Sequence, residues 1–296
     1  MHPLLPILLL LAPPPAPAPM SIEVFSPDGS ISRTTITAAD LPRAKAAADA
    51  EVVTIQQTGP PADRYDLVFI GDGYTAGQQA LFHRQAVARW AQITAYEPFR
   101  TLKDKFNVWQ VNAVSNQSGS DNDPTPGVRK DTALGGGFYC DDLARLICVD
   151  TAVTRSYAAL APGADQALVL VNSTTYGGSG GTVTVSSGGN AQSGDIVVHE
   201  LGHSIGGLAD EYGGPGTYSG GEPSEPNATK RPDTAKWASY LGRPTPDGGV
   251  IGAFEGGAYF DKGVYRPSQN SIMRTLGNEF NLIGIDRLTA AINART

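Results

Sequence analysis

Apolar residues after position 60 form two patterns. Residues 76–94 carry Leu81, Ala88, Trp90 and Ile93 at helical spacing, and a second helix is predicted at about residues 141–160, interrupted near Asp150. Short apolar runs or alternating apolar and polar residues predict strands at residues 65–70, 106–114, 166–172 and 182–186. Strands that alternate with helices predict an α/β or α+β fold built on a mixed twisted sheet.

The segment before position 60 has its own pattern. Residues 21–26 and 30–37 are strand-like and flank Asp28-Gly29, which predicts a hairpin. Residues 59–62 (GPPA) are typical of a linker. The predicted organisation is therefore a small β-rich unit at residues 21–60, of accessory or adhesive type, followed by a main domain at residues 63–296.

The first 20 residues are predicted to be an export signal. An apolar run at residues 4–12 is too short to cross a bilayer, and Ala16-Pro-Ala18 matches the small-x-small pattern of a signal cleavage site. No later stretch is long and apolar enough for a membrane span. The expected location is therefore secreted or periplasmic.

Composition and charge narrow the class of protein. Hydrophobic residues make up 41% of the chain and charged residues 17%, which is typical of a globular protein with a sizeable core. The net charge is −7 and no run of lysine or arginine occurs, so nucleic acid is not an expected partner. Cys140 and Cys148 are the two cysteines, and in an exported protein they predict one disulfide.

The richest chemical signal is the HExxH motif at residues 199–203. His199 and His203 stand four residues apart, so on a helix their imidazoles lie on one face and can bind one tetrahedral cation. Glu200 points aside from the two ligands, where it can act as a general base on a water molecule. The motif predicts one catalytic Zn²⁺ ion.

A catalytic zinc site needs at least one more protein ligand. Asp210 is the first choice, followed by Glu211 and then His83. On a straight helix Asp210 would lie roughly 10 Å further along the axis than His203, but Gly206-Gly207 can end the helix and turn the chain back. The acid that does not bind zinc is expected to orient a histidine.

The sequence resembles the M64 metallopeptidase family, the IgA peptidase group, and is similar more broadly to metzincin zinc peptidases. The carrying segments are residues 68–75, 97–100, 106–109, 129–135, 199–212 (HELGHSIGGLADEY), 221–227 and 271–274. The resemblance implies a zinc endopeptidase in which His199, His203 and Asp210 are ligands and Glu200 is the base. It also implies that Met273 lies in a turn beneath the histidines.

Two positions depart from the metzincin pattern. The usual spacing would place the third ligand at Ala209, which cannot bind zinc, so Asp210 rests on the family resemblance. Some metzincins also carry a tyrosine shortly after the turn methionine, where this chain has Arg274. Arg274, Tyr212 and Tyr265 are the candidates for stabilising the oxyanion or contacting the substrate.

The predicted function is hydrolysis of a protein or peptide substrate. The alternatives are a zinc hydrolase acting on non-peptide amides and a catalytically inactive extracellular binding or adhesion module. Calcium has little support, because the acidic loop with Asp121 and Asp123 lacks the EF-hand pattern. Asp72 is expected in a turn, and Glu222 and Glu225 are expected to be solvated loop acids. The sequence indicates no oligomeric state.

Overall fold

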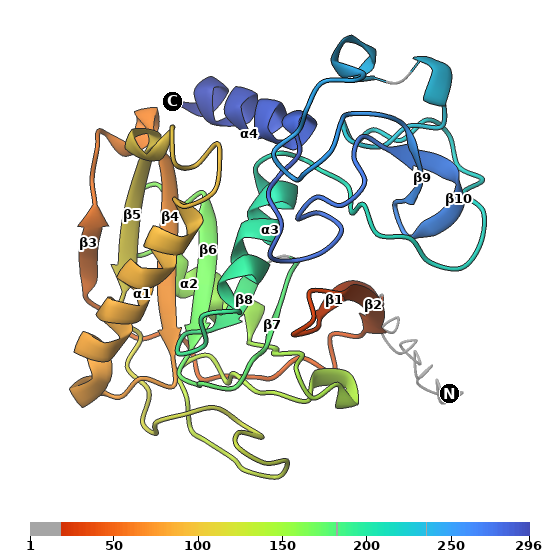
Figure 1. Ribbon diagram of the computed structural model, residues 1–296. Helices are drawn as coiled ribbons and strands as arrows, with labels where there is room; N and C mark the ends of the chain where they lie inside the picture. Colours follow the sequence, from red (N-terminus) through yellow and green to blue (C-terminus); the bar gives the residue numbers. More distant parts are fainter. Residues whose placement is uncertain (1–18, 182, 235) are drawn as a thin grey trace, which may run out of the picture.

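The computed structural model describes residues 19–296 except 182 and 235, and its centre is a six-stranded mixed sheet (Figure 1). The strand order is β3-β5-β4-β6-β8-β7, with the four middle strands parallel and the two outer ones antiparallel to their neighbours. The strands are β3 (Val52–Gln56), β4 (Tyr65–Asp72), β5 (Phe106–Val111), β6 (Gln166–Val171), β7 (Gly178–Ser179) and β8 (Thr184–Ser187). The predicted mixed α/β architecture is confirmed.

Helices cover both faces of this sheet, which explains the continuous apolar run in β4. Leu67 and Phe69 pack in one core with helices α1 (Gln79–Ile93) and α3 (Gly194–Ser204). Val68 and Ile70 point to the opposite face, into a core that includes residues of α2 (Thr151–Ala158). Central parallel strands are buried on both sides and therefore need apolar residues at every position. The C-terminal helix α4 (Leu282–Arg295) adds Leu288 and Ile292 to the first core.

The predicted helix at residues 141–160 is wrong in its first half. Only α2 is an α-helix there, because the Asp150 carboxylate caps it by accepting hydrogen bonds from Ala152 N and Val153 N, both at 3.0 Å. The preceding residues contain a 3₁₀ turn, Cys140–Asp142, and the predicted disulfide between Cys140 and Cys148. A chain closed into so short a loop cannot continue the helix.

The predicted N-terminal hairpin is confirmed as β1 (Met20–Phe25) and β2 (Ile31–Ile36), paired antiparallel. It lies beside β7 (Figure 1). By contrast β3, which also belongs to the predicted unit of residues 21–60, is an edge strand of the central sheet. Residues 1–18 of the predicted export signal lie outside the described residues.

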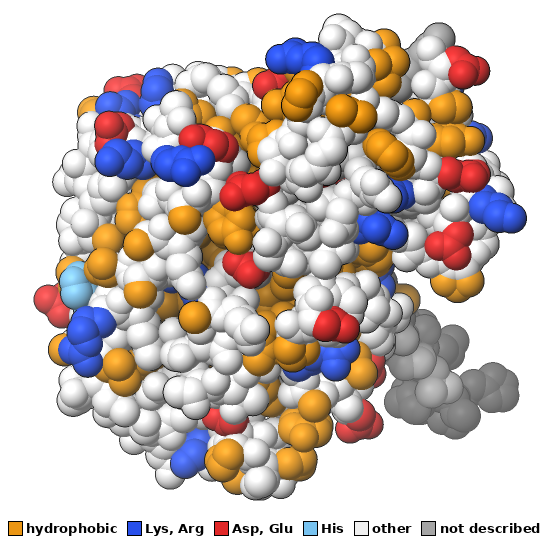
Figure 2. All heavy atoms as spheres, viewed as in Figure 1, with side chains coloured by type: hydrophobic (Ala, Val, Ile, Leu, Met, Phe, Trp, Pro, Cys, Tyr) orange, Lys and Arg blue, Asp and Glu red, His pale blue; other side chains and the backbone are white. Residues whose placement is uncertain are grey.

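Residues 205–281 form a loop-rich region that holds a second hairpin, β9 (Phe254–Gly257) and β10 (Phe260–Arg266). On the face shown in Figure 2, lysine and arginine side chains lie scattered among acidic ones. In the described part of the chain, no helix has the length and apolar character needed to cross a bilayer.

Asp72, the last residue of β4, holds the loop of residues 132–136 against the sheet through hydrogen bonds. Its buried carboxylate accepts hydrogen bonds from the backbone N–H groups of Leu134 at 2.7 Å and Gly136 at 2.8 Å, and from the Thr132 hydroxyl at 3.1 Å. Burial nevertheless raises the pKa of Asp72 from 3.8 to about 6, and the hydrogen bonds only partly oppose this.

This shift predicts a pH dependence of stability. Between about pH 4 and 6 the unfolded chain loses the Asp72 proton before the folded chain does, so stability should fall by about 3 kcal/mol as the pH rises through this window. Urea unfolding of the wild type and Asp72→Asn at several pH values measures this, because asparagine does not titrate. Parallel pH profiles for the two proteins would contradict it.

Candidate metal centre

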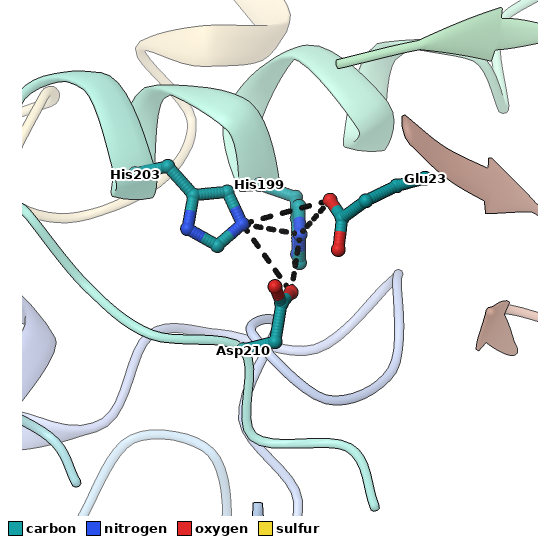
Figure 3. A group of neighbouring side chains, drawn as sticks. All are labelled: Glu23, His199, His203 and Asp210. Carbon is teal, nitrogen blue, oxygen red and sulfur yellow. Dashed lines mark hydrogen bonds and ion pairs between the residues drawn. The ribbon is translucent and has the colours of Figure 1, made fainter. Parts of the chain in front are cut away.

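Helix α3 and the turn that follows it bring three of the predicted residues together (Figure 3). The Nε2 atoms of His199 and His203 lie 3.0 Å apart on one face of α3. The helix ends at Ser204, and Gly207 then adopts a φ of 60°, a backbone conformation that favours glycine. The chain turns back, and Asp210 Oδ1 lies 3.2 Å from His199 Nε2 and 3.3 Å from His203 Nε2.

Backbone carbonyls determine how the two imidazoles are protonated. His199 Nδ1 lies 3.0 Å from the carbonyl oxygen of Ile272, and His203 Nδ1 lies 2.7 Å from that of Leu208. A carbonyl oxygen only accepts hydrogen bonds, so each Nδ1 carries a proton and donates it. In the neutral rings the lone pairs of both Nε2 atoms then face each other and Asp210, which is the tautomer that a metal ligand requires.

A fourth residue, Glu23, joins the cluster from strand β1. Its Oε2 lies 3.2 Å from His199 Nε2 and 3.6 Å from His203 Nε2, and its Oε1 accepts a hydrogen bond of 2.7 Å from the Tyr212 hydroxyl. Glu23 is not predicted from the sequence. In the alternating pattern of residues 21–26 it is simply a polar strand position, and nothing local indicates that it meets a motif 176 residues away.

The donor set fits a zinc ion. The ligand atoms of Glu23, His199, His203 and Asp210 all lie within 4.8 Å of one another, and five of these separations run from 3.0 to 3.6 Å. A tetrahedron with bonds of about 2.0–2.1 Å has edges of about 3.3–3.4 Å. Asp210 Oδ1 is buried and lacks a hydrogen-bond partner in the described structure, which a cation would supply.

Electrostatics favour positive charge at the same point. Burial by itself lowers the pKa of His199, but the contacts with Asp210 and Glu23 outweigh burial and raise this pKa to about 10. Burial raises the pKa of Glu23, yet the two histidines bring it well below its usual value. Two buried carboxylates that stabilise protonated imidazoles would equally stabilise a divalent cation.

Glu200 lies on α3 beside the cluster, and faces a cavity of about 300 Å³ that Glu23, His203 and Asp210 also line. Its Oε1 is buried without a hydrogen-bond partner in the described structure, and burial raises the Glu200 pKa to about 8. Gly180 makes room for this carboxylate, because a Cβ atom there would lie 1.6 Å from Glu200 Oε1. A carboxylate with a raised pKa facing a cavity suits proton transfer near neutral pH.

Met273 lies directly beneath α3. A Cβ atom on Gly202 would come within 2.6 Å of Met273 Sδ, so this glycine lets the methionine pack against the helix between the two histidines. The turn around Met273 also supplies the Ile272 carbonyl that orients His199. Met273 therefore packs against α3, and its role as the turn methionine of the family stays a prediction.

The two other candidates for the third ligand lie away from the cluster. Glu211 accepts hydrogen bonds from Asn227 and Asn281 at 2.9 Å and from Ser271 at 2.8 Å. It thus ties the Met273 turn to α4 and contacts neither histidine. His83 lies on α1, where its Nδ1 pairs with a glutamine.

The candidates for contacting substrate are dispersed. Tyr212 bonds Glu23, whereas Tyr265 and Arg274 are not among the residues lining the Glu200 cavity. Tyr259, which sequence analysis did not select, lines this cavity and donates a hydrogen bond from its hydroxyl to Asp210 Oδ2. It follows β9 with a φ of 73°, and no sequence motif marked it.

The acidic loop candidates make structural contacts. Asp121 pairs with Arg129 at 2.9 Å, and Asp123 accepts a hydrogen bond of 2.7 Å from Thr175. Of the side chains that the structure describes, Glu23, His199, His203 and Asp210 are the one group of three or more histidines, cysteines or acids arranged to hold a metal ion.

Comparison with known proteins identifies the family. No curated protein shows a significant match to this chain. The model of the family described as IgA Peptidase M64 matches residues 53–248 and 243–292, which is most of the chain and includes His199, Glu200, His203 and Asp210. A peptidase family implies a protein or peptide substrate. The chain therefore belongs to the IgA peptidase M64 family.

Proposed function

We propose that this protein is an exported, zinc-dependent endopeptidase. One observation carries the proposal: the HExxH histidines and Asp210 form a largely buried ligand set, and Glu200 faces the same cavity beside them. His199, His203 and Asp210 would hold the ion. The disulfide between Cys140 and Cys148 is compatible with export, because such bonds persist in oxidising compartments.

The chemistry divides between the ion and the chain. Zinc, when bound, acidifies water and polarises the scissile carbonyl group. Glu200 accepts a proton from the attacking water molecule and passes it to the amine that leaves as the peptide bond breaks. The carbonyls of Ile272 and Leu208 hold the two imidazoles in the ligating tautomer throughout. Asp210 is oriented by the Tyr259 hydroxyl.

Metal removal tests the proposal. We expect one zinc ion per chain by elemental analysis, and we expect 1,10-phenanthroline to abolish cleavage of a denatured-protein panel. Adding Zn²⁺ back should restore cleavage, and the non-chelating 1,7-phenanthroline is the matched control. Cleavage that survives complete zinc removal would contradict the mechanism. Cleavage of small amides alone would favour the non-peptide hydrolase, and bound zinc without any hydrolysis, both before and after limited trypsin treatment, would favour an inactive binding module.

A further inference from the structure

The position of Glu23 is unexpected for an active hydrolase. A catalytic zinc site keeps a position open for water or substrate, whereas this cluster already offers four protein ligands. Three of them belong to α3 and its following turn. The fourth arrives from the N-terminal hairpin, which lies outside the portion matched by the family model, since that match begins at residue 53. The matched portion therefore provides three ligands and leaves the fourth position to the hairpin.

Several contacts hold the hairpin over the site. Glu23 accepts the hydrogen bond from Tyr212, and its cross-strand neighbour Arg33 stacks its guanidinium 3.6 Å from the centre of the Tyr259 ring. Phe25 meets the His199 ring edge to face at 5.5 Å. Arg33 and Glu23 thus engage the two tyrosines around the metal cluster, one from each strand of the hairpin.

The hairpin also takes up space that a substrate would need. Ser21, Ile22, Glu23 and Arg33 line the cavity that Glu200 faces, opposite Gly180 and Gly181. Glu200, His203 and Asp210 line this same cavity, so a peptide carbonyl placed in it would lie next to both the carboxylate and the ligand set. The interface with the hairpin is incompletely packed, because a second cavity of about 190 Å³ lies between Ile22 and Ile36 on one side and Ser179 and Val185 on the other.

We propose that the β1–β2 hairpin is an inhibitory segment, in which the Glu23 carboxylate takes the metal position that water needs and the two strands block the substrate cavity. The described form is then a latent enzyme. This inference rests on the proposed function, because latency presupposes a peptidase. The two proposals are separate, because latency concerns only which group occupies the fourth position at the metal.

The link to the main domain offers a route to activation. Residues 37–51 have no helix or strand, and both Arg43 and Lys45 are exposed. A protease that cuts after basic residues would add water across one peptide bond there and would need no other reactant. Cutting turns a tethered inhibitor, present at roughly millimolar effective concentration, into a separable peptide.

The first test asks whether Glu23 competes for the metal position. Acetohydroxamate binding to the zinc-loaded full chain is measured by calorimetry for the wild type, Glu23→Ala and Asp28→Asn. Asp28 is a carboxylate of the same hairpin that only caps its own turn, so it is the matched control. We expect Glu23→Ala to bind the probe about tenfold or more tightly than the wild type, while Asp28→Asn does not differ from it.

Two results of this test would overturn the inference. Equal affinities in the wild type and Glu23→Ala would show that the carboxylate does not compete. Loss of zinc from Glu23→Ala would show that Glu23 is an obligatory ligand and not a displaceable one. Retention of one zinc ion per chain is therefore part of the expected result.

The second test uses limited trypsin treatment of the full chain, with cuts located by mass spectrometry. After the released peptide is removed by gel filtration, protein cleavage should rise about tenfold or more over the intact chain. Adding back a synthetic peptide of residues 20–36 should lower the rate of protein cleavage again. The same peptide with Glu23→Ala should inhibit more weakly. An intact chain as active as the cut one overturns latency and leaves the proposed function standing. If the acetohydroxamate pattern holds but no form cleaves protein, the proposed function fails instead.

Discussion

Replacing Glu200 with glutamine is expected to lower the rate of protein cleavage by about 10²–10⁴-fold, the usual worth of a general base, while zinc stays bound. Glutamine preserves the size of the side chain and cannot accept the proton. The carboxylate lies beside the ligand set without belonging to it, so metal affinity should change little. Steady-state rates and zinc content measured on the same trypsin-activated preparation give both quantities.

Glu225→Gln is the matched control for this experiment. Glu225 lies in the loop after α3 and is not among the residues that line the Glu200 cavity. Its substitution should leave both the rate and the zinc content within twofold or so of the wild type. A Glu200→Gln protein with near wild-type rates would show that another group moves the proton.

Asp210→Ala is expected to weaken zinc binding by more than about 100-fold, beyond the range for residues that merely orient a ligand. Asp210 Oδ1 faces both Nε2 atoms, and alanine leaves a position that no neighbouring side chain of the described structure fills. Competition with a chromophoric zinc chelator measures the affinity. Glu211→Gln, which alters the adjacent acid, is the comparison for this experiment.

Glu211→Gln should lower the stability of the protein more than it lowers the affinity for zinc. Its carboxylate accepts three hydrogen bonds in a buried site, and the amide group of glutamine would leave at least one donor unpaired, at a cost of about 1–3 kcal/mol. Urea unfolding of the metal-free proteins measures this. Zinc affinity should fall less than tenfold or so, because the Glu211 carboxylate bonds Asn227, Ser271 and Asn281 and neither histidine. The reverse pattern, with zinc lost from Glu211→Gln and kept by Asp210→Ala, would make Glu211 the ligand.

Much of the fold followed from local patterns. The apolar run in β4 and the helical spacing in α1 predicted those elements, because burial on two faces or on one stripe leaves a direct trace in the sequence. The helix predicted over residues 141–160 is wrong before Asp150, whose side chain sets where α2 begins. Asp150 starts α2 by capping its first N–H groups, and two residues of the disulfide-closed loop before it, Asp141 and Asp142, have positive φ.

The sequence by itself determined the α3 half of the metal centre. Four-residue spacing on a helix brings His199 and His203 together whatever surrounds them, and Glu200 is placed by the same helix. Only the tertiary structure decided which of Asp210 and Glu211, adjacent in sequence, lies against the two histidines. The turn at Gly207 and a buried network of asparagines send one to the histidines and the other to the Met273 turn. Glu23 also needed the tertiary structure, because a contact across 176 residues is set by how the hairpin packs and leaves no periodic signal in the chain.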